Sequence, residues 1–327
     1  MANSPLPRHT LAALNERRNW PSAWRLALHL GLLCALGTAV VFALQSAWAE
    51  HTLGGWRFVL ALACWLAYGV VFSFLGYAGL GHELAHHTVF SSRALNVALF
   101  HLVSFLSWSN PVYFRASHRV HHQHTLQQGV DYEVNPDPYP LLERWWRFAV
   151  FDTDAFKRAA TIYWNNTRDR VPGPFGQGHF AVGTTARRQL VHTARWHVAL
   201  HTTLALVALA LGFWPWVLLL TLAAFVCTLP NRVLAKLQHA ALPRNAGDLR
   251  HNTRTLLLPK PLAFLYWNMN YHTEHHLHPS VPYYNLPRLR TALAGHLPHT
   301  APGLLPHLHA LRMPAQQHSH PLCKEKP

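Results

Sequence analysis

Long apolar blocks, separated by polar and histidine-rich stretches, dominate the pattern of the chain. The run from Ala23 to Ala49 has one arginine and one histidine near its start and is otherwise largely apolar or small. A helix of about 20 such residues crosses a bilayer. The run from Trp56 to Gly81 is equally long. The pattern therefore predicts two membrane-spanning helices, at about 25–47 and 56–79.

A third apolar block runs from Ala199 to Leu229 and is too long for one span. Gly212 to Pro215 interrupts it with residues typical of a tight turn. We therefore expect two further spans, at about 199–212 and 215–230. The predicted fold is an all-α integral membrane protein with four transmembrane helices in two hairpins.

The polar segments complete the expected organisation as a single membrane domain, 1–327. A helical cap at 80–198 and 231–312 follows the hairpins and holds the histidines. The end of the chain, 313–327, has the composition of a mobile tail. The sequence shows no repeat of fixed period.

Composition and charge support a membrane location. Half of the residues are hydrophobic, only 13% are charged, and the net charge is +15. Lys and Arg concentrate before the first span, between spans two and three, and after span four. By the positive-inside rule, both termini and the histidines face the cytoplasm, and we expect a bacterial inner membrane. Residues 1–22 do not resemble a cleavable signal peptide. The positive charge suits anionic lipid, and no motif indicates nucleic-acid binding.

Three histidine clusters lie in the expected cap. With 27 histidines in 327 residues, chance predicts only about 0.2 HxxHH patterns, yet two are present. Imidazole is the commonest metal ligand, and on a helix these spacings direct the rings into one arc. Each HxxHH box is therefore expected to form half of a metal site. The clusters are His82, His86 and His87, then His118, His121 and His122, then His272, His275 and His276.

The spans are expected to carry two of the clustered histidines into place. If the second helix continues through His87, its end projects into the cytosol, with His82 and His86 on one face. His87 then points about 140° away from His82 and is the least secure ligand. A fourth helix that continues from Trp216 would place His239 at the same level.

The ligand count favours two metal ions, because a catalytic zinc typically uses three protein ligands. HELAH at 82–86 matches the HExxH of zinc proteases, but a protease leaves both HxxHH boxes unexplained. A metal transporter would need ligands inside the spans, whereas these boxes lie beyond them. Imidazole ligands suit Fe, Zn, Cu or Ni alike. Acidic residues beside the boxes are expected to accept hydrogen bonds from ring N–H groups, with solvation on the helix surface or a salt bridge as the alternative: Glu83, Asp131 and Glu274.

At these residues the chain resembles the membrane fatty acid desaturase superfamily, with its HxxxH, HxxHH and late HxxHH boxes. The most specific stretch is NMNYHTEHHLHPSVPYYNLPRL at 268–289. The resemblance implies a centre of two iron ions and adds Asn270, before the third box, as a supporting residue. It implies nine ligands: His82, His86, His118, His121, His122, His239, His272, His275 and His276.

The resemblance implies an O2-dependent enzyme that introduces a double bond into a fatty acyl chain. The HE-leading first box also resembles membrane alkane hydroxylases. A hydroxylase, monooxygenase or ketolase acting on an alkane, a carotenoid or another apolar compound is therefore the alternative. Ala235 departs from animal-type acyl-CoA desaturases, which carry asparagine at this position.

Electrons are expected from a separate partner. The chain has no GxGxxG turn for a dinucleotide and no cysteine set for an iron–sulfur cluster. We therefore expect a ferredoxin, or a cytochrome with its reductase, as the donor. The other expected partners are membrane lipids and a lipid or acyl-chain substrate, whose carrier group the sequence leaves open.

Overall fold

The structure, a computed structural model, describes residues 5–49, 55–138 and 141–315. Within these ranges the regular elements are helices, and strand pairing is limited to two isolated bridges. The predicted all-α class is thus confirmed. Most of the tail that was expected to be mobile, 316–327, lies outside the described residues.

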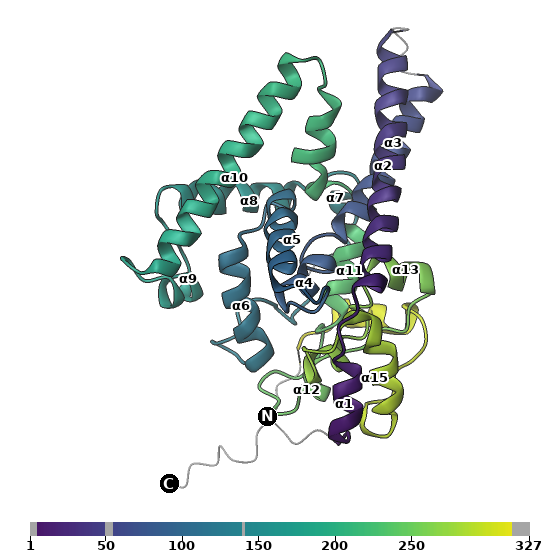
Figure 1. Ribbon diagram of the computed structural model, residues 1–327, viewed down its shortest axis with the longest axis vertical. Coiled ribbons are helices and arrows are strands. Elements are labelled where there is room, and N and C mark those ends of the chain that lie inside the picture. Colours follow the sequence, from purple (N-terminus) through teal and green to yellow (C-terminus); the bar gives the residue numbers. More distant parts are fainter. Residues whose placement is uncertain (1–4, 50–54, 139–140, 316–327) are drawn as a thin grey trace.

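The first hairpin consists of α2 (Asn19–Ala49) and α3 (Trp56–Ser73), preceded by the short α1 (Arg8–Leu14). Two helical stretches, Arg8–Gln45 and Trp56–Ser73, are long and apolar enough to cross a membrane. Many large apolar side chains along both helices are exposed, as expected for surfaces that face lipid. Figure 1 shows α2 and α3 side by side, projecting beyond the rest of the molecule. These helices correspond to the first two predicted spans.

The second hairpin is present but shorter in its apolar part. Its first arm is α10 (Thr185–Ala210), and the chain reverses at Gly212, whose φ is 74°. The apolar half of α10, 199–210, rises only about 18 Å, less than the roughly 30 Å of a hydrocarbon core. The returning arm is a π-helical turn, η1 (Val217–Thr221), followed by a 3-10 turn, η2 (Ala223–Phe225). Although Figure 1 shows this hairpin rising on the same side as the first, the predicted arrangement of four spans is supported for two helices only.

The expected continuous helix from Trp56 through His87 is wrong. α3 ends at Ser73, and a tight turn separates it from α4 (Leu80–Ala85). In the turn, the backbone N–H of Leu80 donates to the Phe74 carbonyl at 3.0 Å. A side chain at Gly79 would overlap that same carbonyl, so the turn requires glycine there. α4 is thereby a separate helix that carries the first histidine box into the interior.

The expected continuous fourth helix, from Trp216 to Lys236 and on to His239, is also wrong. The chain leaves the helical path at Cys227, whose φ is 45°, and Val226 forms an isolated bridge with Phe151. A new helix, α11 (Leu229–Leu237), begins with proline in its first turn, which a helix tolerates only there. His239 lies two residues beyond the end of α11.

Close backbone packing fixes this break beside the first hairpin. A Cβ added to Gly69 of α3 would lie 2.5 Å from the carbonyl oxygen of Val226. Only glycine lets the two segments approach so closely. Asp152 secures the other side, since its backbone N–H donates to Phe225 at 2.7 Å and its carboxylate pairs with Arg232.

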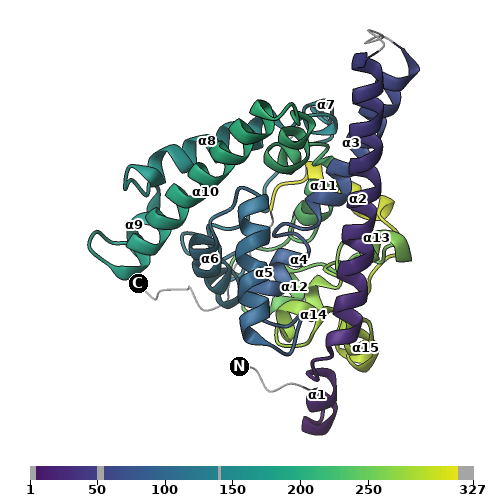
Figure 2. The ribbon, with the colours of Figure 1, turned by 45° about the horizontal axis from the view of Figure 1, so that its top comes forward.

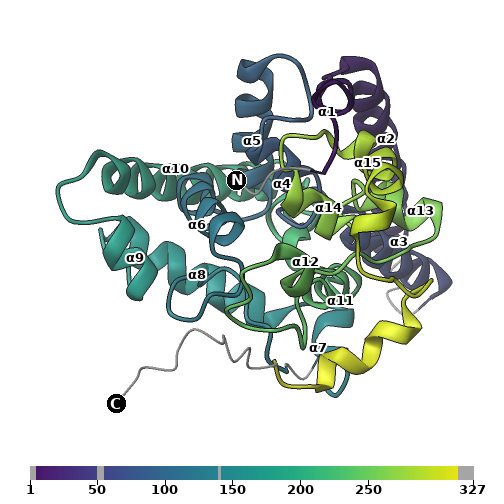
Figure 3. The same cartoon turned by 90° about the horizontal axis from the view of Figure 1, so that it is seen from below.

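The remaining helices form the cap around one buried cluster of histidines. Figures 2 and 3 show α4, α12 and α14 at the centre, between α6 on one side and α2 and α15 on the other. An asparagine at the N-cap of α6, Asn110, accepts a hydrogen bond from the Val112 N–H at 3.1 Å, which fixes where the second histidine box begins. The cap elements are α5 (Arg93–Leu106), α6 (Pro111–Gln123), α7 (Trp146–Ala149), α8 (Thr153–Thr167), α9 (Pro174–His179), α12 (Leu249–Asn252), α13 (Lys260–Leu265), α14 (His272–Leu277), η3 (Tyr283–Asn285), α15 (Leu286–Ala292), η4 (Ala294–His296) and η5 (Leu305–Arg312).

Candidate metal centre

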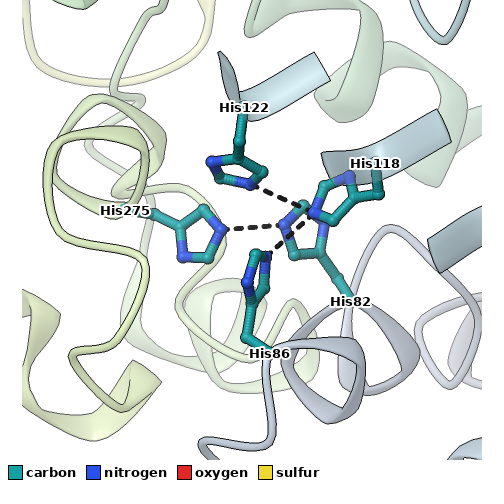
Figure 4. A group of neighbouring side chains, drawn as sticks. All are labelled: His82, His86, His118, His122 and His275. Carbon is teal, nitrogen blue, oxygen red and sulfur yellow. Dashed lines mark hydrogen bonds between the residues drawn. The ribbon is translucent and has the colours of Figure 1, made fainter. Parts of the chain in front are cut away.

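The structure brings all nine predicted ligand histidines into two adjacent groups. Within each group, the ring nitrogens lie within 4.8 Å of one another. The first, the five-histidine group, is drawn in Figure 4 with its rings converging on one another. The five-histidine group comprises His82, His86, His118, His122 and His275, and the four-histidine group comprises His121, His239, His272 and His276.

The two groups form one continuous site. The rings of His122 and His276, one from each group, stack with their centroids 4.2 Å apart. Seven of the nine side chains are buried, and His86 and His122 are half-buried. His87 belongs to neither group: it adopts a φ of 58° just after α4. Its position agrees with its being the least secure of the predicted ligands.

Each HxxHH box serves both groups, so the expectation that one box forms half of a site is wrong. In α6, His118 and His122 belong to the five-histidine group, while His121 belongs to the other. In α14 only His275 belongs to the five-histidine group. Helix geometry explains the division, because residues three and four positions onward lie on opposite sides of the first, about 100° apart.

The Nε2 atoms of the histidines point toward one another inside each group. His82 and His275 approach with their Nε2 atoms 2.9 Å apart, as do His239 and His272. The Nδ1 atoms face away from the centre of each group. That of His82 lies 3.2 Å from the Tyr77 carbonyl oxygen, and that of His239 lies 3.0 Å from the Asn252 carbonyl oxygen. A carbonyl only accepts, so Nδ1 carries the proton and Nε2 keeps its lone pair. Converging lone pairs are the arrangement that a cation stabilises.

Carboxylates support the outer side of the second box. Asp131 Oδ2 lies 2.8 Å from Nδ1 of His121, and Glu133 Oε1 lies 2.6 Å from Nδ1 of His118. Such contacts fix the tautomer and ring orientation of a ligand histidine and raise its basicity. Asp131 was among the predicted supporting residues, whereas Glu133 was missed. The only sequence signal was its place two residues after Asp131, in the same acidic stretch.

Glu83 and Glu274, the predicted supporting residues of the first and third boxes, make different contacts. Glu83 is fully buried, and its Oε1 lies 3.4 Å from Nδ1 of His275. Glu274 instead accepts from Arg290 at 2.6 Å and from the Thr255 hydroxyl. The expectation that Glu274 supports a ligand ring is therefore corrected to the alternative, a salt bridge.

Asn270 also acts on the backbone rather than on a ligand ring. Its side-chain amide donates to the carbonyl of Leu256 at 2.8 Å, and the Leu256 N–H donates back to the Asn270 carbonyl at 2.8 Å. These two bonds anchor the start of the third box to the preceding segment. Its expected support of the metal ligands is thus, in this structure, indirect.

Burial keeps most of the imidazoles uncharged. It lowers the pKa of His86 and of His239 to about 3, because a buried charge loses its hydration. Burial also opposes protonation of His121, but the hydrogen bond with Asp131 and the charges of Glu133 and Asp131 together outweigh it and raise the pKa of His121. Neutral imidazoles are the form that binds metal ions. The donor set, its tautomers and its charge state all fit two metal ions, one in each group.

Comparison with protein families agrees with this geometry. Residues 55–304, which include all nine histidines and most of the chain, match the family described as fatty acid desaturase. The chain belongs to the fatty acid desaturase family. A comparison with curated proteins found none that matches. As a family member, the protein is assigned to desaturase- and hydroxylase-type oxidoreductases that are typically membrane-bound, in agreement with its two long apolar helices.

Proposed function

We propose that this family member is a di-iron, O2-dependent desaturase that introduces a double bond into a fatty acyl chain. The observation that carries the proposal is the pair of adjacent groups made of imidazoles alone, inside a chain of the desaturase family. A zinc protease would use only His82 and His86 of the first box, and the other seven histidines would then have no purpose.

The nine histidines would hold two iron ions, which supply the O2-dependent oxidation that removes hydrogen from a methylene. The chain's own residues supply orientation and shielding. Phe114 stacks on the ring of His118, with centroids 4.7 Å apart, and Tyr77 stacks on Phe114 at 3.7 Å. This aromatic layer excludes water from one side of the five-histidine group, and the carboxylates of Asp131 and Glu133 hold the rings of the second box.

The membrane setting leads us to propose an apolar substrate. We place both hairpins in a bacterial inner membrane and the cap, with both termini, in the cytoplasm, as one domain of 1–327. An acyl chain would then enter the site from the lipid. Electrons would come from a separate ferredoxin, or from a cytochrome with its reductase, because the chain has no dinucleotide motif.

The proposal is tested by lipid mass spectrometry of cells that express the wild type or the His275→Ala variant, together with the donor. New acyl species lighter by two hydrogen atoms, formed by the wild type and absent with the variant, are expected. His87→Ala is the matched control, because His87 lies outside both groups, and it should retain the product. Species heavier by one oxygen atom would replace the proposal with the hydroxylase alternative.

A further inference from the structure

A cavity lies in the cap, beside the third histidine box. Its volume is about 720 Å³, within the range of small-molecule sites. Its lining residues come from the segment before α12, from α12, α14 and α15, and from the segments that follow α12 and α15. Three arginines and four histidines line it, and no acidic side chain is among the lining residues in the described part of the chain. The arginines are Arg250, Arg254 and Arg290.

The positive charge of the cavity is only partly balanced. Arg250 pairs with Asp248 at 2.6 Å, and Arg290 pairs with Glu274 at 2.6 Å. Arg254 instead donates to the backbone carbonyls of Leu237 and Ala240, at 2.5 and 3.1 Å. Among the residues described, no carboxylate lies within ion-pair distance of Arg254. One guanidinium charge beside the cavity therefore has no anionic partner among the residues that the structure describes.

The place of the cavity indicates where its ligand comes from. Figure 1 shows α12 and α15 at the end of the molecule opposite to the tips of both hairpins. If the hairpins lie in the bilayer, as the proposed function has them, this end lies on the aqueous side. That placement favours a soluble ligand over a lipid head group.

We propose that this cavity binds a soluble phosphate ester of about the size of a nucleoside diphosphate. Guanidinium groups bind phosphate with paired, charge-assisted hydrogen bonds. Thr253 and Thr300, whose hydroxyls donate to the backbone carbonyls of Leu249 and Pro298, line the same cavity and add to its polar surface. The histidines, among them His299, extend the polar lining. Arg290 connects the cavity to the metal centre, because its partner Glu274 directly precedes His275.

Equilibrium binding tests the proposal on the full chain purified in detergent, with ADP and inorganic pyrophosphate as probes. Saturable binding of ADP at one site per chain is expected. Arg250→Gln should weaken it about tenfold or more, since a hydrogen bond to a charged group contributes about 1.5–3 kcal/mol. Arg254→Lys keeps the charge but loses the paired geometry, and it should weaken binding less than Arg254→Met. His299→Ala is a further variant that leaves the backbone contacts of Arg254 intact.

The matched control is Arg288→Gln, which removes one exposed positive charge from α15 outside the cavity lining. Unchanged ADP affinity in this variant supports the proposal. Equal weakening by Arg288→Gln and Arg250→Gln, or no saturable binding, would overturn it. Binding of phosphatidylglycerol vesicles that ADP displaces and Arg250→Gln abolishes would also overturn it, in favour of a lipid head group. Because the binding is measured on metal-free and iron-loaded protein alike, its outcome is distinct from that of the desaturase test.

Discussion

Glu133 and Asp131 should each strengthen the binding of a different metal ion. Glu133 contacts His118 of the five-histidine group, and Asp131 contacts His121 of the four-histidine group. Glu133→Gln and Asp131→Asn are nearly isosteric, so they remove a carboxylate charge with little change in packing. We therefore expect each substitution to weaken the binding of one ion and to leave the binding of the other unchanged.

The magnitude follows from the contacts. Glu133 Oε1 lies 2.6 Å from His118 Nδ1, and its Oε2 accepts from the Ser117 hydroxyl at 2.8 Å. A glutamine keeps one acceptor but places an amide against the other partner. Loss of such an outer contact typically lowers metal affinity about 10–100-fold, which corresponds to about 1.4–2.7 kcal/mol.

The assay is iron content per chain, measured by elemental mass spectrometry after dialysis against a graded series of chelator concentrations. The wild type should retain two irons at chelator concentrations where each single variant retains one. The double variant should lose both. Glu143→Gln, which neutralises an exposed carboxylate in the same part of the chain, should behave as the wild type.

Two results would refute this reasoning. Retention of both irons by Glu133→Gln, at the chelator concentration tolerated by Glu143→Gln, would show that the carboxylate contact does not support the ligand. Loss of both irons together in each single variant would show that the two groups do not bind independently.

Three further predictions concern the ligands, the ion pair and pH. His86→Ala should lose iron on chelator dialysis while His87→Ala keeps it, because only His86 belongs to a group; equal iron content would disprove this assignment. Arg290→Met should lower the free energy of unfolding by about 3 kcal/mol or more, because it leaves the fully buried Glu274 without its ion-pair partner. Arg290→Lys should lower it less. An unchanged thermal midpoint in circular dichroism melts of Arg290→Met would contradict a stabilising role of this ion pair. In metal-free protein, the pKa values of about 3 for His86 and His239 lie below the ordinary 6.5, so the unfolded chain binds more protons between these values. The thermal midpoint should then fall as pH is lowered from about 6.5 toward 3, and a midpoint that stays constant over this range would argue against buried neutral imidazoles.

The sequence was sufficient for the elements that depend on local composition. The first hairpin follows from apolar length alone, and the reversal at Gly212 follows from turn residues. The break at Cys227 was missed because a tertiary contact decides it: the close approach of Gly69 to Val226 cannot be derived from either segment separately. The break after Ser73 had a local signal in Gly79, which the turn requires. Proline in the first turn of α11 was the local signal of the later helix boundary.

The same distinction applies to the metal centre. The spacing of the boxes and the family resemblance identified the nine histidines that converge. Helix geometry separates the second histidine of an HxxHH box from the third, but the group that each one joins depends on how α4, α6 and α14 cross. Glu133 was missed because it reaches His118 through a loop rather than along a helix. The direction of Glu274 was open to prediction: two residues after His272, it lies about 200° around the helix, on the side where Arg290 contacts it.

Because each HxxHH box contributes histidines to both groups, neither metal site can be complete before the last box is synthesised. Each group takes at least one histidine from α14, the last box to be synthesised. Neither ion can therefore be fully held until the chain has emerged through His276 and α14 has packed against α4 and α6. In the five-histidine group, an ion would then link residues 193 positions apart, His82 and His275. A cross-link that closes so long a loop removes much of the freedom of the unfolded chain. If the proposed iron ions occupy the two groups, they would stabilise the fold only after α14 has packed, and therefore late in folding.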